Sequence, residues 1–253
     1  MPSIPIVYIN LAKDAERKQR MQAQFSNLGL AASRLPAVWW NDLDEEAKAY
    51  YFSSQLNSRQ YFKPMGNGEK GCYCSHITAW RQLLDGDAPA LAVFEDDVRL
   101  LPTLPQALQS IAALPADRWD MIKLFGRPKE KIASRKYLSD SSLELISYSR
   151  IPSFATGYVV SRAGAHKLLA SRLPFGRPID VDLRFWFEND LQVFGIQPSV
   201  IALDDTSEVS SIWMEKEPPP ALPQRLRKLR MKLELGWGNA LHRAKTPKAS
   251  HIL

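Results

Sequence analysis

An apolar run that ends in three consecutive acidic residues constrains this chain more than any other feature. Residues 90–94 are all apolar, and Glu95, Asp96 and Asp97 follow them directly. A continuous apolar run of this length is typical of a strand that is covered on both faces of a sheet. Because open α/β sheets bind ligands at the carboxyl ends of their strands, we expect the three acids at a binding edge.

Three neighbouring carboxylates repel one another, and removing them from water without a partner costs free energy. A hard divalent cation such as Mg2+ or Mn2+ offsets that cost, because it takes carboxylate and phosphate oxygens together as ligands. We therefore predict a metal and diphosphate site at Glu95, Asp96 and Asp97. The alternative, which the local sequence leaves open, is a solvated acidic turn after a strand.

Length and composition indicate a globular protein. The chain has 253 residues, 45% hydrophobic and 24% charged, which suits one large α/β domain or two small ones. We expect no secretory signal at its start, and no apolar run approaches the roughly 20 residues that span a bilayer. Cys72 and Cys74 are too close in sequence for a common disulfide and too few for a zinc quartet. We expect both to be small buried residues in a reducing compartment.

The N-terminal residues predict the start of a nucleotide-binding α/β fold. Residues 5–11 predict a strand, and Lys13 to Leu28 predicts the helix that follows it. The sequence has neither G-x-G-x-x-G nor G-K-[ST], so it offers no dinucleotide fingerprint and no P-loop. Arg17 lies about one turn into the helix, where it can reach a phosphate.

Two further polar residues, His76 and Lys123, lie in predicted elements that are mainly apolar, and each is a candidate site residue. His76 lies in a predicted helix that follows a Gly-Asn-Gly turn at residues 66–68, and it is either a buried imidazole or a site residue. Lys123 lies amid apolar residues of a strand predicted over residues 119–126. Because an interior lysine is rarely left unpaired, it needs a carboxylate or a ligand phosphate. The polar residues 127–140 are expected to form a loop.

The net charge of +6 is concentrated at the C-terminus, where the residues after Pro220 include eight basic residues and one acidic residue. Residues 217–220 predict a stiff proline-rich boundary, and Leu222 to Leu241 predicts a helix. Its apolar face consists of Leu222, Leu226, Leu229, Leu233 and Trp237. Such a basic helix either lies on an anionic membrane surface or packs its leucines on the core, and both remain open. We expect no nucleic-acid partner, because no aromatic platform is interleaved with the basic residues.

Several segments together resemble glycosyltransferase family 25, the bacterial lipooligosaccharide sugar transferases. They are residues 7–11 with Arg17, residues 68–72 with Ser75, His76 and Trp80, residues 93–98, residues 120–126, residues 156–158 with Gly164 and Ala165, and residues 178–180. Their order and spacing over about residues 5–212 carry the resemblance. The chain departs from the family at Trp39 and Trp40, where Asp-Gly commonly follows Ala-Val.

The resemblance implies a GT-A-like α/β fold: a single Rossmann-type nucleotide-sugar-binding domain with a mixed, mostly parallel sheet. We assign this catalytic domain to residues 1–216, and the proline-rich boundary and basic helical tail to residues 217–253. It also implies an inverting transfer, often of galactose, from a UDP-sugar with Mn2+ or Mg2+. Asp97 is then expected to bind the metal ion, while Glu95 and Asp96 contact the metal ion or the donor.

A carboxylate must also remove a proton from the acceptor hydroxyl. Asp180 and Asp182 are the candidates, because they follow a proline turn and lie outside the acidic triplet; Asp180 matches the family motif better. The alternative for both is capping of a helix N-terminus. Other expected donor or acceptor contacts are Lys123 and Arg17 at phosphates, Asn10 and Leu11 at the base, and His76, Thr156, Gly157 and Tyr158 at a sugar.

Taken together, these features predict a cytoplasmic glycosyltransferase, peripheral on the inner membrane, that extends a lipid-linked saccharide. Two alternatives use the same residues. One is a metal-dependent nucleotidyltransferase or phosphohydrolase, and the other is a catalytically silent member that only binds saccharide or membrane.

Overall fold

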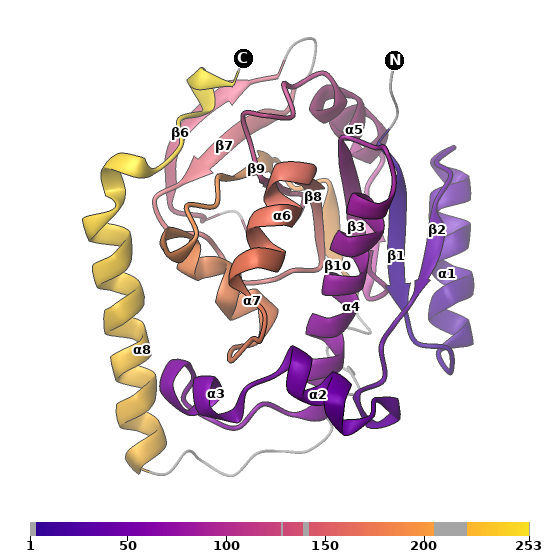
Figure 1. Ribbon diagram of the computed structural model, residues 1–253. Coiled ribbons are helices and arrows are strands. Elements are labelled where there is room, and N and C mark those ends of the chain that lie inside the picture. Colours follow the sequence, from indigo (N-terminus) through magenta and orange to yellow (C-terminus); the bar gives the residue numbers. More distant parts are fainter. Residues whose placement is uncertain (1–3, 128, 139–141, 205–221, 253) are drawn as a thin grey trace.

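The computed structural model describes residues 4–127, 129–138, 142–204 and 222–252, which form an α/β domain around one large sheet (Figure 1). The sheet has eight strands in the order β2-β1-β3-β8-β5-β9-β7-β6. Their bounds in that order are Ser33–Pro36, Ile6–Asn10, Ala90–Glu95, Gly157–Ser161, Met121–Lys123, Val193–Gln197, Glu144–Tyr148 and Ile132–Tyr137. A small antiparallel pair, β4 (Val98–Leu100) and β10 (Ile201–Leu203), lies beyond the acidic triplet.

The sheet is mixed, as predicted. Within the described residues, β1 pairs in parallel with β2 and β3, and β5 with β9. The other four pairings are antiparallel. The parallel character is therefore concentrated at β2-β1-β3, where the carboxyl ends of three strands share one edge and the triplet follows β3.

Helices cover both faces of the sheet. On one face lie α4 (Asn67–Asp85) and α6 (Arg162–Ser171), together with α7 (Ile179–Asp182) and the 3-10 helix η2 (Leu183–Glu188). On the other face lie α1 (Ala15–Asn27) and α5 (Leu104–Ala112). Two short helices, α2 (Glu45–Tyr51) and α3 (Ser54–Gln60), lie between β2 and α4 in the sequence. Single-turn 3-10 helices occur at Trp40–Asp42, Arg243–Lys245 and Ala249–His251.

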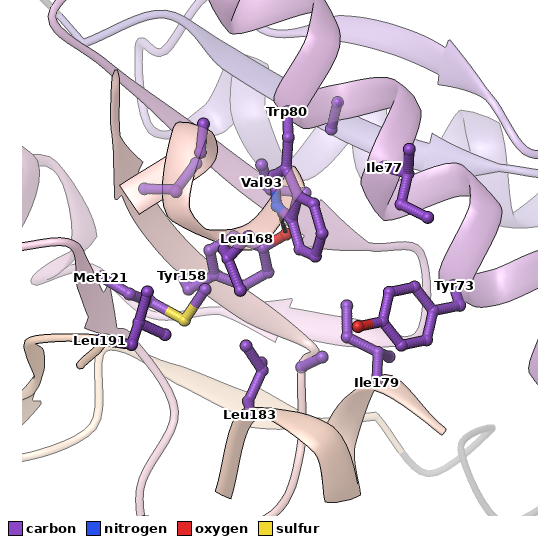
Figure 2. Packing of buried hydrophobic residues seen from close by; sticks show 14 of the residues in the cluster. Tyr73, Ile77, Trp80, Val93, Met121, Tyr158, Leu168, Ile179, Leu183 and Leu191 are labelled. Atoms are coloured by element: carbon purple, nitrogen blue, oxygen red, sulfur yellow. Dashed lines mark hydrogen bonds between the residues drawn. The ribbon is translucent and has the colours of Figure 1, made fainter. Parts of the chain in front are cut away.

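Strand β3 is buried on both faces because its alternate side chains enter two separate apolar clusters. Leu91 and Val93 pack in the cluster with Trp80, which Figure 2 shows from close by. Ala92 and Phe94 pack in the cluster of the opposite face. This double burial explains the continuous apolar run in the sequence.

Two local predictions were wrong. Residues 66–68 do not form a separate turn; Gly66 precedes α4, and its backbone N–H donates to the carboxylate of Glu69 at 2.7 Å, which satisfies the helix start. The predicted loop over residues 127–140 contains β6, whose exposed and half-exposed residues alternate. An edge strand with polar residues on its solvent side has the composition of a loop, so composition alone concealed it.

The C-terminal helix α8 (Leu222–Leu241) has the predicted bounds and lies along one side of the domain (Figure 1). It packs through Met231, Leu235 and Gly238. At Gly238 a Cβ atom would lie 2.0 Å from the ring of Phe187, so only glycine allows this contact with η2. Beyond α8, the backbone N–H of Ala249 donates to Ser134 of β6 at 2.9 Å.

The predicted leucine face of α8 does not pack on the core. Each residue of the stripe is at least 54% exposed: Leu222, Leu226, Leu229, Leu233, Trp237 and Leu241. At 100° per residue, this stripe lies on the side of the helix opposite to Met231 and Leu235. The structure therefore excludes one of the two alternatives, that these leucines belong to the core. Within the described residues, no helix is both long and apolar enough to cross a membrane.

Candidate active site

The acidic triplet lies where β3 ends and the chain turns into β4. Glu95 is the last residue of β3, and its backbone N–H donates to the carbonyl of Thr156 at 2.9 Å. This bond places the start of β8 beside the triplet. The Thr156 hydroxyl oxygen is buried without a hydrogen-bond partner among the described residues, so the expectation that it contacts a ligand stays a prediction. Leu11 is half-buried after β1, and the expectation that it lines the nucleotide base also stays a prediction.

Asp96 is held by protein groups on both carboxylate oxygens. One oxygen accepts from the Asn10 side chain at 2.7 Å, and the other forms an ion pair with Arg17 at 3.1 Å. Burial raises the pKa of Asp96, and the bonds from Asn10 and Arg17 oppose that rise. Asn10 is 1% exposed and its side chain is engaged by Asp96, and the expectation that it lines the nucleotide base stays a prediction. Arg17 holds Asp96 of the triplet in place through this ion pair, and the expectation that Arg17 contacts a phosphate stays a prediction.

Asp97 has a carboxylate oxygen that is both buried and, in the described part of the chain, unpartnered. Its Oδ1 atom is buried and has no hydrogen-bond partner among the described residues. Burial raises the pKa of Asp97 to about 7, and the charges of Glu95 and Asp96 add to that rise. An orphaned carboxylate oxygen beside a second, partly exposed carboxylate provides the donor set of a hard divalent ion. The residues present therefore fit the predicted metal ion.

Asp180 on α7 belongs to the same group of charges. It is half-buried, and its pKa is raised by burial and by the charge of Glu95, against the opposing charge of Lys123. A carboxylate whose pKa lies above its ordinary value is a stronger base than an exposed one. Asp180 therefore remains the predicted base.

Lys123 lies near Asp180, but it needs no phosphate. Its ammonium group donates to three backbone carbonyl oxygens, those of Pro152 at 2.8 Å, Ser153 at 3.3 Å and Phe154 at 2.6 Å. These three acceptors match the three N–H donors of a lysine. The hydrogen-bond partners of Lys123 are thus carbonyl oxygens and not the anion that was expected, and its role at a phosphate stays a prediction. Burial lowers its pKa to about 8.

Asp182, the second candidate base, has a structural role. It is 3% exposed, and its carboxylate accepts from the Tyr73 phenol at 2.6 Å and from Arg177 at 2.7 Å. Arg172 forms a further ion pair with it at 3.4 Å. These bonds enclose the carboxylate and favour Asp180 as the base, and the catalytic role expected of Asp182 stays a prediction.

Glu95 is contacted by two residues of α4. Its Oε1 atom lies 3.6 Å from the sulfur of Cys72 and 3.2 Å from Nε2 of His76. The preceding residue, Gly71, lets α4 lie against the backbone of Val38, because a Cβ atom there would lie 2.6 Å from the carbonyl oxygen of Val38. Ligand atoms of Cys72, His76 and Glu95 lie within 4.8 Å of one another, although hydrogen bonds between them explain that proximity.

Three residues predicted to contact a sugar are enclosed. His76 is 0% exposed and Tyr158 is 1% exposed, and His76 Nδ1 lies 2.8 Å from the Tyr158 hydroxyl. Gly157 has no room for a side chain, because a Cβ atom would lie 2.3 Å from Ile201. The side chains of His76 and Tyr158 are therefore closed to a ligand in this fold, and the sugar contacts expected of the three residues stay predictions.

Cys72, in contrast, was expected to be only a small buried residue, yet it contacts Glu95. Its i, i+4 spacing from His76 on one helix face was the available signal. Cys74 is buried, as predicted.

Comparison with known proteins places these residues in a family. The model of glycosyltransferase family 25 (LPS biosynthesis protein) matches residues 3–183, a range that includes the acidic triplet and Asp180. The chain belongs to glycosyltransferase family 25. The family match confirms the resemblance seen in the sequence, and it ends before α8.

Family 25 relatives occur in animals. A glycosyltransferase 25 family member from Drosophila melanogaster is 31% identical over 70% of this chain and 29% of its own length. Procollagen galactosyltransferase 2 from Homo sapiens is 26% identical over 82% of this chain and 38% of its own length. An inactive family member from Mus musculus is 27% identical over 82% of this chain and 40% of its own. The chain thus spans about a third of the length of the first relatives that it matches.

Among solved structures, a Drosophila galactosyltransferase 7 mutant in complex with manganese, UDP-Gal and xylobiose aligns with a TM-score of 0.42. The alignment has 11% identity and covers 90% of this chain and 80% of that chain. This likeness is too distant to bear on the site.

Proposed function

We propose that this chain is a metal-dependent, inverting glycosyltransferase that moves a sugar, galactose first, from a UDP-sugar to a saccharide acceptor. The observation that carries the proposal is the unpartnered, buried Oδ1 atom of Asp97 beside Glu95 and Asp96, at the carboxyl edge of β3. Membership of family 25 and the name of the human relative favour galactose. A solvated acidic turn would not leave such an oxygen enclosed.

Asp97 and Glu95 are the residues that would hold Mn2+ or Mg2+. When bound, such an ion neutralises the negative charge that develops on the leaving diphosphate. Asp96 is already occupied by Asn10 and Arg17, so its contribution is to keep the turn in place and add negative charge.

Asp180 would act as the general base. Its carboxylate takes the proton of the acceptor hydroxyl while that oxygen forms a bond to the anomeric carbon of the donor. The bond from the anomeric carbon to the diphosphate oxygen breaks, and UDP leaves with the electron pair. A single displacement of this kind inverts the anomeric centre. Asp180 is free for this role, whereas both carboxylate oxygens of Asp182 are bonded to protein groups.

A lipid-linked saccharide, such as a lipooligosaccharide, is the acceptor class that we favour, with the protein peripheral on the cytoplasmic side of the inner membrane. The exposed stripe of α8 supports this proposal. It presents six large apolar side chains, and Arg225, Arg227, Arg230 and Lys232 are exposed on the same helix. Apolar side chains flanked by cations suit an anionic lipid surface.

A transfer assay tests the proposed activity. UDP-galactose, UDP-glucose and UDP-N-acetylglucosamine are each incubated with Mn2+ and either a lipid-linked saccharide, a collagen peptide or no acceptor. We expect galactose transfer to the lipid-linked saccharide, with an inverted anomeric centre by NMR, and its loss in Asp97→Ala. Transfer to the collagen peptide would correct the acceptor class and keep the activity.

The same assay separates the alternatives. Nucleotide release without an acceptor indicates a phosphohydrolase, and reaction only with a nucleoside triphosphate indicates a nucleotidyltransferase. A protein that binds saccharide or vesicles but turns over no donor is the silent member, a known state of the family, since one relative is named inactive.

A further inference from the structure

Three buried side chains form a chain of hydrogen bonds that ends on Glu95. The indole Nε1 of Trp80 lies 2.9 Å from the Tyr158 hydroxyl, a pair that Figure 2 shows in the core below α4. The Tyr158 hydroxyl lies 2.8 Å from Nδ1 of His76, and Nε2 of His76 lies 3.2 Å from Oε1 of Glu95. Trp80, Tyr158 and His76 are each at most 1% exposed.

The donors and acceptors of these groups give the chain one direction. An indole N–H only donates, so the Tyr158 oxygen accepts from Trp80. The phenol proton is then available to Nδ1 of His76, which accepts it as a neutral imidazole. The remaining imidazole proton lies on Nε2 and is donated to Glu95. In this arrangement the indole of Trp80, the hydroxyl of Tyr158 and both ring nitrogens of His76 each have a hydrogen-bond partner.

The arrangement leaves the two oxygens of Glu95 in different states. Oε1 is contacted by His76 and by the Cys72 thiol, which adds a weak donor at 3.6 Å. Oε2 has no hydrogen-bond partner among the described residues. Because the Glu95 side chain is 24% exposed, an oxygen of this carboxylate is accessible to a ligand. The protein therefore anchors one oxygen and leaves the other free.

We propose that Tyr158 and His76 are positioning residues, which fix the carboxylate of Glu95 so that its free oxygen meets the donor diphosphate or its metal ion. The proposal rests on the proposed function of the acidic triplet. Neither residue can touch a substrate, because both are enclosed. They act only through Glu95, in the way that hydrogen-bonded groups behind a metal ligand orient it.

Removing one hydroxyl tests this relay. Tyr158→Phe keeps the ring in the core but leaves the Trp80 N–H and the His76 Nδ1 without their partner. The imidazole proton is then no longer fixed on Nε2, and the bond to Glu95 weakens. Loss of an orienting partner typically costs about 10–100-fold in metal affinity or activity. We expect the Mn2+ concentration for half-maximal UDP binding, measured by calorimetry, to rise at least about tenfold.

Tyr8→Phe is the matched control. Tyr8 lies in β1 of the same sheet and is 1% exposed, and its hydroxyl is buried without a partner among the described residues. This change removes the same atoms with no hydrogen bond to lose, so Mn2+-dependent UDP binding should equal that of the wild type. Cys72→Ala, at a half-buried position, removes the other donor to Oε1 and should weaken Mn2+-dependent binding by a smaller factor.

A double-mutant cycle with Glu95→Gln shows whether the effect runs through Glu95. We expect Tyr158→Phe to cause little further loss in that background, because residues of one network are not additive. Equal UDP binding by Tyr158→Phe and wild type, or an undiminished effect in the Glu95→Gln background, would overturn the positioning role alone. A wild type that binds no UDP with Mn2+ would overturn the proposed function as well.

Discussion

The phenol of Tyr73 donates a 2.6 Å hydrogen bond to Asp182, and so joins helix α4 to helix α7 beneath the candidate site. Arg177 and Arg172 complete the surroundings of that carboxylate. Asp180, two residues earlier on α7, instead faces the charges of Glu95 and Lys123. The two aspartates of one short helix therefore have different tasks.

Substitution of each aspartate should separate stability from turnover. Asp182→Ala leaves buried arginines short of a partner and should destabilise the protein by about 3 kcal/mol. The value lies at the low end for a buried pair because Glu188 still pairs with Arg177. Asp180→Asn should leave the melting temperature almost unchanged and lower kcat by about 10²–10⁴-fold. A loss of turnover without a loss of stability in Asp182→Ala would contradict both assignments.

Asp97→Asn should stabilise the metal-free protein while it abolishes metal-dependent transfer. Burial raises the pKa of Asp97 to about 7, so the folded protein loses stability as the pH rises from about 4, where the unfolded carboxyl ionises, to about 7, and the loss is constant above that pH. The asparagine carries no charge and removes that cost, about 1–3 kcal/mol, or several degrees in melting temperature. Calorimetry in a chelator should find the gain at pH 8 and none below about pH 3, where the carboxyl of Asp97 is protonated in both the folded and the unfolded state. A lower melting temperature at pH 8 would contradict the prediction.

Metal affinity should depend on pH through the same group. A metal ion needs the ionised carboxylate, and protons compete for Asp97 below about pH 7. The Mn2+ concentration for half-maximal UDP binding should therefore rise below pH 7, by up to about tenfold for each pH unit. Titrations between pH 5.5 and pH 8 check this. A flat profile over that range would show that Asp97 is not a ligand.

The exposed stripe of α8 should bind membranes without contributing to the core. Leu229→Glu with Leu233→Glu should reduce sedimentation with phosphatidylserine vesicles and leave the melting temperature and soluble-acceptor transfer unchanged. Added salt should weaken wild-type binding, because the flanking cations are screened. Phosphatidylcholine vesicles are the lipid control.

Leu235→Ala is the control on the opposite side of α8. Leu235 is 1% exposed, so its truncation should destabilise the contact with the domain by about 2–5 kcal/mol. Vesicle binding by the intact helix should persist. If Leu229→Glu with Leu233→Glu lowers the melting temperature as much as Leu235→Ala does, the stripe belongs to an interface of the fold.

Local patterns predicted several features correctly. The helix Leu222–Leu241 has the predicted bounds, and α6 begins at a serine of the type that commonly caps helices: the Ser161 hydroxyl accepts from the backbone N–H of Gly164 at 3.1 Å. Both depend on residues within one or two helical turns. The partner of Lys123 was predicted wrongly, because its three carbonyl acceptors lie about 30 residues away and carry no side-chain signature.

By itself, the sequence determined the α/β class, the central strand, the acidic triplet that follows it and the family, because each of these is written in a local pattern or in the order of such patterns. Only the tertiary structure decided which carboxylates are engaged. Asp180 and Asp182 are the same residue type, two positions apart on α7. Because positions i and i+2 of a helix point to nearly opposite sides, Asp182 meets Arg177 and Tyr73 while Asp180 lies beside the triplet. It likewise decided which side of α8 is buried, because both faces of that helix offer apolar residues, and contacts with the domain, such as those of Trp186 with Asn239 and of Phe187 with Gly238, select the face of Met231 and Leu235.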